Sequence, residues 1–87
     1  ATALALSELR NFLMNRSLRY KVLLRELFVR RGWRELKAAL EVAEGRAIND
    51  KVLYVLLREL IDHGIVEKVN DEYVIADPIL RRAVLKL

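Results

Sequence analysis

The chain has 87 residues, of which 54% are hydrophobic and 32% are charged, and its formal net charge is +4. A chain this short supports one domain of simple fold, because it buries only about 60–65% of the surface exposed by its unfolded form. It contains no cysteine, which excludes disulfides, thiolate zinc sites and thiol nucleophiles. No apolar run approaches the ~20 residues of a membrane span and no signal peptide is evident, so we expect a cytoplasmic protein without membrane contact.

The positive charge is concentrated in the first half of the chain. Residues 1–43 hold nine Lys and Arg against four Asp and Glu, whereas residues 44–87 hold seven against eight. A basic half is typical of chains that bind phosphates or an acidic partner, and a solvated helix face is the alternative. High charge without cysteine or glutamine is typical of heat-adapted proteins. The start at Ala1 rather than at methionine indicates an excised domain or a processed terminus.

Two helices are predicted before Gly32. Residues 4–15 carry an apolar stripe at helical spacing, formed by Leu6, Leu9, Phe12 and Leu13. Ser17 is the expected N-cap of a second helix over residues 18–31. Gly32 is expected to end that helix in the left-handed conformation.

The next two helices are separated by a tight turn. We expect a helix over residues 33–43, with its core face formed by Trp33, Leu36, Ala39, Leu40 and Ala43. Asn49 is the expected N-cap of a helix over residues 50–63, with Ile48 and Leu53 as a hydrophobic staple. Gly64 is expected to stop this helix. The face that should be buried consists of Val52, Leu53, Leu56, Leu57 and Leu60.

The pattern changes to β structure after Gly64. Two short runs, residues 65–69 and 72–75, are rich in β-branched side chains and flank an Asn-Asp pair, which predicts a hairpin. Tyr73 and Ile75 should face the helices, because side chains two apart share one face of a strand. Asp77 and Pro78 then predict the N-cap and first residue of a last short helix.

These elements predict an α+β, mainly helical domain. A lone hairpin is unstable in water and must lay its apolar face on the preceding helices. The order therefore indicates a winged helix-turn-helix over residues 16–87, with a C-terminal helix after the wing. Residues 1–15 form an extra N-terminal helix or linker to a preceding domain. Its apolar stripe should pack on the domain's own core or pair with a second copy of the chain.

Residues 15–87, about five-sixths of the chain, resemble the C-terminal winged-helix domain of the archaeal P-loop ATPase family. The ending Tyr73-Val74-Ile75-Ala76-Asp77-Pro78-Ile79-Leu80 is the most specific piece. The other matching positions are Arg16, Tyr20, Trp33, Glu35, Leu36, Lys37, Ile48-Asn49-Asp50, Leu57, Leu60 and Gly64-Ile65-Val66-Glu67-Lys68. The resemblance implies an accessory domain whose partner is the P-loop ATPase domain of the same parent chain.

We expect no catalytic site, metal site or cofactor in this chain. Its three glycines are well separated and no Gly-Lys-Ser/Thr run exists, so a phosphate-binding loop is excluded. His63 is the sole histidine, and its place in the last turn of a helix is typical of a partner for the helix dipole. The acids Asp71 and Glu72 lie in a turn, where solvation accounts for them, and clustered metal ligands are missing.

Binding of double-stranded DNA is the leading hypothesis for a site. The outward face of the helix over residues 50–63 should enter the major groove, as in other helix-turn-helix proteins. The candidate nucleic-acid-binding residues are Arg46, Lys51, Tyr54, Arg58 and Lys68. Asp50, Glu59 and Asp62 share the helix and should oppose these cations, so we expect weak binding that is mostly to phosphates.

We therefore interpret the chain as a non-catalytic winged-helix accessory domain of a larger ATPase, which contacts DNA or the ATPase core. The alternative is a protein-interaction or dimerisation module without nucleic-acid binding, in which the apolar side of residues 4–13 pairs with a second copy. A basic cluster at the start of the helix over residues 33–43 opposes the helix dipole, which indicates either a ligand for these charges or heat-adapted surface chemistry. The cluster consists of Arg30, Arg31, Arg34 and Lys37.

Overall fold

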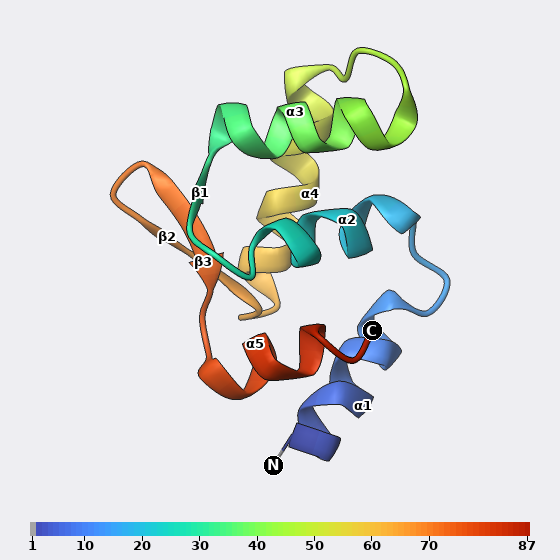
Figure 1. The fold of residues 1–87 in the computed structure, drawn as a ribbon, viewed down its shortest axis with the longest axis vertical. Coiled ribbons are helices and arrows are strands. Elements are labelled where there is room, and N and C mark those ends of the chain that lie inside the picture. Colours follow the sequence, from blue (N-terminus) through green and yellow to red (C-terminus); the bar gives the residue numbers. More distant parts are fainter. Residues whose placement is uncertain (1) are drawn as a thin grey trace.

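The computed structural model describes residues 2–87, which form five helices and a three-stranded antiparallel sheet. The helices are α1 (Thr2–Leu13), α2 (Leu18–Glu26), α3 (Trp33–Glu44), α4 (Asp50–Asp62) and α5 (Pro78–Val84). The strands β1 (Arg31–Gly32), β2 (Val66–Val69) and β3 (Glu72–Ile75) lie in the order β1-β3-β2. Figure 1 shows α3 at one end of the molecule, α1 and α5 at the other, and the hairpin beside the helices. The predicted winged helix-turn-helix order is confirmed.

Leucines of α2, α3 and α4 form the centre of the core. Six of them have no exposed surface, namely Leu23, Leu24, Leu36, Leu40, Leu53 and Leu60. No buried polar or charged side chain occurs in the described part of the chain. Burying an apolar side chain of this size stabilises a fold by about 1.5–3 kcal/mol. The helical stripes that the sequence predicts therefore meet in one apolar core, and all charged groups remain near the surface.

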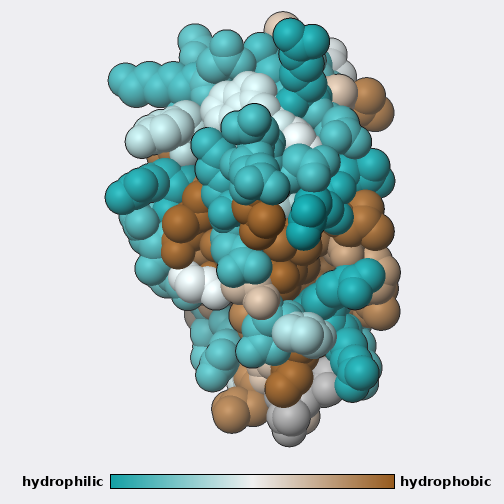
Figure 2. Space-filling model, turned by 90° about the vertical axis from the view of Figure 1, so that its left-hand side faces the viewer, coloured by the Kyte–Doolittle hydropathy of each residue, from teal (hydrophilic) through white to brown (hydrophobic). Residues whose placement is uncertain are grey.

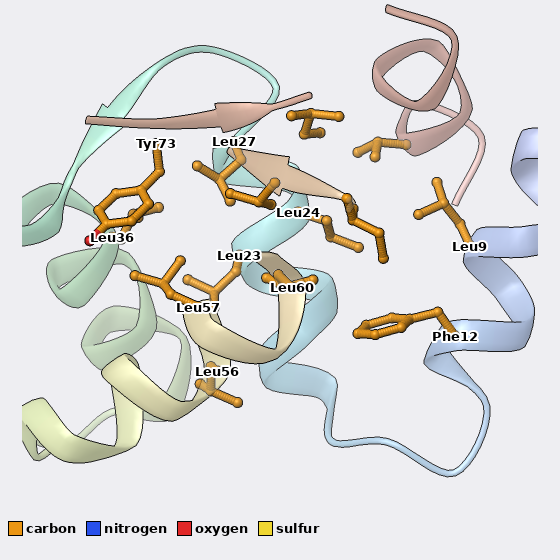
Figure 3. Packing of buried hydrophobic residues seen from close by; sticks show 14 of the residues in the cluster. Leu9, Phe12, Leu23, Leu24, Leu27, Leu36, Leu56, Leu57, Leu60 and Tyr73 are labelled. Atoms are coloured by element: carbon orange, nitrogen blue, oxygen red, sulfur yellow. The ribbon is translucent and has the colours of Figure 1, made fainter. Parts of the chain in front are cut away.

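The hairpin forms where it was predicted, between Gly64 and Asp77. Cross-strand partners are Val66 with Ile75 and Lys68 with Tyr73. Tyr73 and Ile75 are both buried, as expected from their spacing, and Figure 3 shows Tyr73 among leucines of α3 and α4. Asn70 adopts φ 57°, a left-handed conformation that asparagine tolerates better than most residues. This conformation allows the two-residue turn to close. The hairpin itself is held against the helices by the buried side chain of Tyr73.

The prediction of a helix over residues 18–31 was wrong at its C-terminal end. Helix α2 stops at Glu26, and Arg31 and Gly32 form strand β1, which pairs with Tyr73 and Glu72 of β3. Gly32 adopts φ −86° and ψ 172°, which is extended rather than left-handed, and it is the N-cap of α3. The chain must be extended to join the sheet, and a strand of two residues is too short to show a periodicity of its own.

Most helix ends match the capping residues that the sequence predicts. The side chains of Ser17, Asn49 and Asp77 each accept a hydrogen bond from the backbone N–H two residues further on. Gly64 follows α4 with φ 72°, and the Ile65 N–H donates to the Leu60 carbonyl at 3.0 Å. These local signals therefore set the bounds of α4, the helix whose outward face was predicted to bind DNA.

Helix α1 packs on the domain itself. Its apolar side contacts α5, and Ala5, Leu9 and Phe12 are buried in the common core, where Figure 3 shows Leu9 and Phe12 at the edge of the cluster. This confirms packing on the domain's own core, the first of the two expected outcomes for the stripe. The apolar side of residues 4–13 is therefore not left unpaired, because α5 packs against it, and dimerisation through this helix stays a prediction.

Two side chains of α3 differ from the expected core face. Ala43 is exposed rather than buried. Trp33 is only partly buried against the core, and its Nε1–H lies 3.4 Å from Oδ1 of Asp50. Trp33 therefore connects the beginnings of α3 and α4 in addition to packing on the core.

Replacement of Leu9 by alanine should destabilise the domain by about 2–5 kcal/mol, because Leu9 is 1% exposed and its removal leaves a cavity between α1 and the core. The matched control is Leu4→Ala on the same helix, where the side chain is 66% exposed, and it should change stability by less than about 0.5 kcal/mol. Urea unfolding followed by circular dichroism measures both. Equal effects of the two variants would show that α1 does not pack as described.

Replacement of Gly64 by alanine should cost about 1–2 kcal/mol, because its φ of 72° lies in the region that a Cβ disfavours. Gly32→Ala should cost clearly less, since φ there is −86° and a Cβ would meet only the flexible end of Glu35 at 3.5 Å. Thermal unfolding of both variants checks this order. A larger loss at Gly32 would contradict the extended conformation of β1.

Candidate nucleic-acid interface

The outward face of α4 carries three of the five predicted site residues. Lys51, Tyr54 and Arg58 are all exposed, and the exposed fractions are 57% for Tyr54 and 62% for the Arg58 side chain. They point outward because Leu53, Leu56, Leu57 and Leu60 occupy the opposite side of the helix. An ammonium group, a phenol and a guanidinium on one exposed helix face can all donate hydrogen bonds to phosphate oxygens.

The other two predicted residues lie outside α4. Arg46 is in the loop between α3 and α4, with a side chain that is 68% exposed and an Nε 3.4 Å from Oε1 of Glu44. Lys68 is exposed on β2, and its Nζ lies 5.8 Å from the centre of the Tyr73 ring. Because Lys68 is the cross-strand partner of Tyr73, it stands on the face of the hairpin that is turned toward the helices. The structure thus places one cation before α4 and another on the wing that follows it.

The acids of α4 do not oppose the site as the sequence indicated. Asp50 pairs with Lys37 of α3, at 2.8 Å between Nζ and Oδ1, and Glu59 accepts a hydrogen bond from Arg16 at 2.9 Å. Both carboxylates turn toward neighbouring elements of the domain. Asp62 alone pairs with a site residue, at 3.2 Å from Nε of Arg58. That exposed pair is worth only about 0.3–0.5 kcal/mol and can yield to a phosphate.

The basic cluster at the start of α3 has partners within the domain. Lys37 holds Asp50, and Arg31 lies 3.3 Å from Glu35 and 3.7 Å from Glu26. Glu35 also accepts a hydrogen bond from the Gly32 N–H at 3.1 Å, which offsets the unfavourable charge at this helix start. This backbone bond, followed by the Arg31 side chain, lowers the pKa of Glu35. Structural ion pairs therefore account for most of the cluster, whereas no carboxylate partner of exposed Arg34 occurs among residues 2–87.

A bidentate ion pair joins α2 to the end of α3. Both Oε atoms of Glu44 accept hydrogen bonds from the Arg19 guanidinium, with Nη2 to Oε1 at 2.9 Å. These hydrogen bonds hold the pKa of Glu44 below its ordinary value of 4.5. Similarly, the hydrogen bond from Lys37 lowers the pKa of Asp50. The sequence analysis missed both pairs, because their members are far apart in the chain and follow no helical period.

His63 has a structural role at the end of α4. Its Nδ1 lies 3.0 Å from the carbonyl oxygen of Glu59, and its ring meets the ring of Phe12 edge to face. Across residues 2–87, no three histidine or acidic side chains gather where they could hold a metal ion. Within the same range, none of the helices combines the length and apolar character needed to cross a membrane.

Comparison with known families identifies the central part of the chain. Residues 15–76 match the model of the MCM protein C-terminal winged helix-turn-helix domain. The matched range contains α2, α3, α4 and the sheet, whereas α1 and α5 lie outside it. No curated protein matches the chain. The match begins where the predicted resemblance begins and ends at Ala76, so residues 77–87 of that resemblance lie beyond it.

Replacement of Glu44 by glutamine should destabilise the domain at pH 7 and have less effect at low pH. The pKa of Glu44 is lower in the folded than in the unfolded state, so its contribution is present above pH 4.5 and is lost as the pH falls through the folded value. Urea unfolding at several pH values between 7 and 3 measures the difference from wild type. Glu67→Gln, on exposed β2, is the control and should show no such trend. A difference that grows on acidification would contradict the pairing.

Proposed function

Because this chain belongs to the family of MCM C-terminal winged helix-turn-helix domains, we propose that it contacts the phosphate backbone of duplex DNA as an accessory domain of a P-loop ATPase. The domain carries no catalytic chemistry, and the ATPase domain of the parent chain supplies it. The arrangement on α4 carries the proposal. Lys51, Tyr54 and Arg58 point outward, whereas Asp50 and Glu59 are paired with cations of other elements.

The charges on this surface favour weak, sequence-independent binding. Lys51 and Lys68 have no carboxylate partner within the described residues. Arg46, by contrast, forms an ion pair with Glu44, and Arg58 forms one with Asp62. A reading helix that discriminates bases uses bidentate contacts of arginine or amide side chains, and Arg58 is the one candidate of that kind on α4. Phosphate contacts therefore dominate, with Tyr54 as an additional hydrogen-bond donor.

Contact with the ATPase core of the same parent chain is the second candidate function. The observation that favours it is an apolar hollow of ≈ 410 Å³ beside the cations of α4, into which Val52, Val55 and Leu56 project. Val55 is 51% exposed, and a partner seated in this hollow would bury it. A protein-interaction role without DNA is the alternative if no duplex binds. Dimerisation, an archaeal source, adaptation to heat and a cytoplasmic location stay predictions.

Binding of random-sequence duplexes should weaken with salt, with a slope of log affinity against log salt no steeper than roughly −4. The reason is that each neutralised phosphate contributes about −0.9 and four cations are available. Lys51→Ala should reduce the slope by about 1 for every duplex. The matched control is Lys86→Ala, in the turn after α5 and close to the C-terminus (Figure 1). Fluorescence anisotropy at several salt concentrations measures both. Absence of binding at low salt would reject the DNA contact and favour the protein-interaction role.

Replacement of Asp62 by asparagine should strengthen DNA binding and steepen the salt slope. The carboxylate competes with phosphate for Arg58, at 3.2 Å from its Nε, and asparagine removes that competition. Glu8→Gln, on the exposed side of α1, removes one negative charge that pairs with none of the five candidate residues and should have little effect. The same titration compares the two variants. An equal gain from both would show that only net charge matters and that Arg58 does not contact DNA.

A further inference from the structure

Helices α2 and α3 leave an apolar groove on the surface of the domain. One hollow of ≈ 440 Å³ is lined by Leu18, Val22, Leu40 and Ala43, together with the pair Arg19 and Glu44. A second hollow of ≈ 360 Å³ is lined by Ala38, Ala39 and Val42, together with Glu26, Arg31 and Glu35. Both hollows are lined by residues of α3 and of α2, and the second is lined by Arg31 of β1 as well. We call the combined surface the α2–α3 groove.

The most exposed large apolar side chains of the described chain border this groove. Leu18 on α2 is 78% exposed and Val42 on α3 is 83% exposed. The side chains between them are small, since Ala38, Ala39 and Ala43 line the α3 side. Two prominent apolar residues on either side of a floor of alanines suit close approach of another helix, as in helix-in-groove recognition.

The charged side chains in and beside the groove include two unpaired cations on α2. Its acids are largely paired, because Glu44 is held by Arg19, and Glu26 and Glu35 share Arg31. On α2, by contrast, Lys21 and Arg25 have no carboxylate partner within residues 2–87. They are one helical turn apart and follow Leu18 along the same helix. Lys21 and Arg25 line neither hollow, so the unpaired positive charge lies on the flank of α2 beside the groove.

We propose that the α2–α3 groove binds an amphipathic helix of another protein, which carries an apolar stripe and a row of carboxylates along one flank. The stripe covers Leu18, Val42 and the alanines between them, and the carboxylates face Lys21 and Arg25. This proposal does not depend on DNA binding, since none of the five candidate DNA-binding residues lines the groove. The uncovered apolar surface supplies affinity, and the unpaired cations select an acidic partner and its orientation.

The test uses two synthetic helical peptides of about 18 residues, ~27 Å in length. Both carry leucine and alanine along one stripe, and they differ only in glutamates or lysines on one flank. Each is titrated into the isotope-labelled 87-residue chain while backbone amide chemical shifts are followed. We expect the acidic peptide to bind at least about tenfold more tightly than the basic one, with shifts confined to α2 and α3.

Variants then distinguish the groove from other surfaces. Val42→Glu should reduce the affinity for the acidic peptide at least about tenfold, whereas Val55→Glu, on the exposed face of α4, should not reduce it. Charge reversal with Lys21→Glu and Arg25→Glu should transfer the preference to the basic peptide. The matched control is the reversal of Arg82, on α5, and Lys86, in the turn that follows it, a cation pair at the same sequence spacing. Because all these side chains are at least partly exposed, the variants should fold, and circular dichroism verifies this.

Three results would overturn the proposal. Equal affinity for the acidic and basic peptides would show that Lys21 and Arg25 do not select an acidic partner. Shifts centred on α4, or equal losses from Val42→Glu and Val55→Glu, would place the binding surface elsewhere. Concentration-dependent shifts at the groove in the free chain, with a dimer in sedimentation, would make a second copy the occupant. The peptide titration contains no DNA, so its failure is distinct from failure of duplex binding.

Discussion

Burial of the α4 leucines fixes the orientation on which both proposed surfaces depend. Leu53 and Leu60 have no exposed surface, and Leu56 and Leu57 are at most 6% exposed. Rotating the helix to present another face to solvent would expose this stripe, at about 0.8 kcal/mol for each CH₂ returned to water. The outward direction of Lys51 and Arg58 is thus a consequence of core packing, and their own interactions contribute little to it.

The parts of the fold that could be predicted are those specified by residues close together in the sequence. Capping residues such as Ser17 and Asn49 act over two residues, and the stripe of α4 repeats over three turns, so both are readable in one sequence. Strand β1 has no such local signal. Its extended backbone arises from pairing with Tyr73 and Glu72, some forty positions later in the chain. The pairing of β1 with β3, two segments that are far apart in the sequence, therefore determines where α2 ends.

The same distinction applies to the candidate site. The outward positions of Lys51, Tyr54 and Arg58 follow from helical periodicity, and the structure agrees with it. The partners of the acids do not follow from periodicity, because Arg16–Glu59 and Lys37–Asp50 join different elements. Counting the charges on α4 alone therefore overstated the repulsion that a phosphate would meet.

The two proposed surfaces meet at one ion pair. Arg19 lines the hollow beside Lys51 and Val55 as well as the hollow beside Leu18, and in the isolated domain Glu44 neutralises its guanidinium. Helices α1 and α5, outside the family match, pack together at the end away from α3 and cover neither surface (Figure 1). Figure 2, which views the molecule from the side of the hairpin, shows hydrophobic residues interrupted by hydrophilic ones. Because Arg19 lines both hollows, the carboxylates of an acidic helix bound in the groove would lie near Lys51 and would lower the positive charge that a phosphate meets on α4.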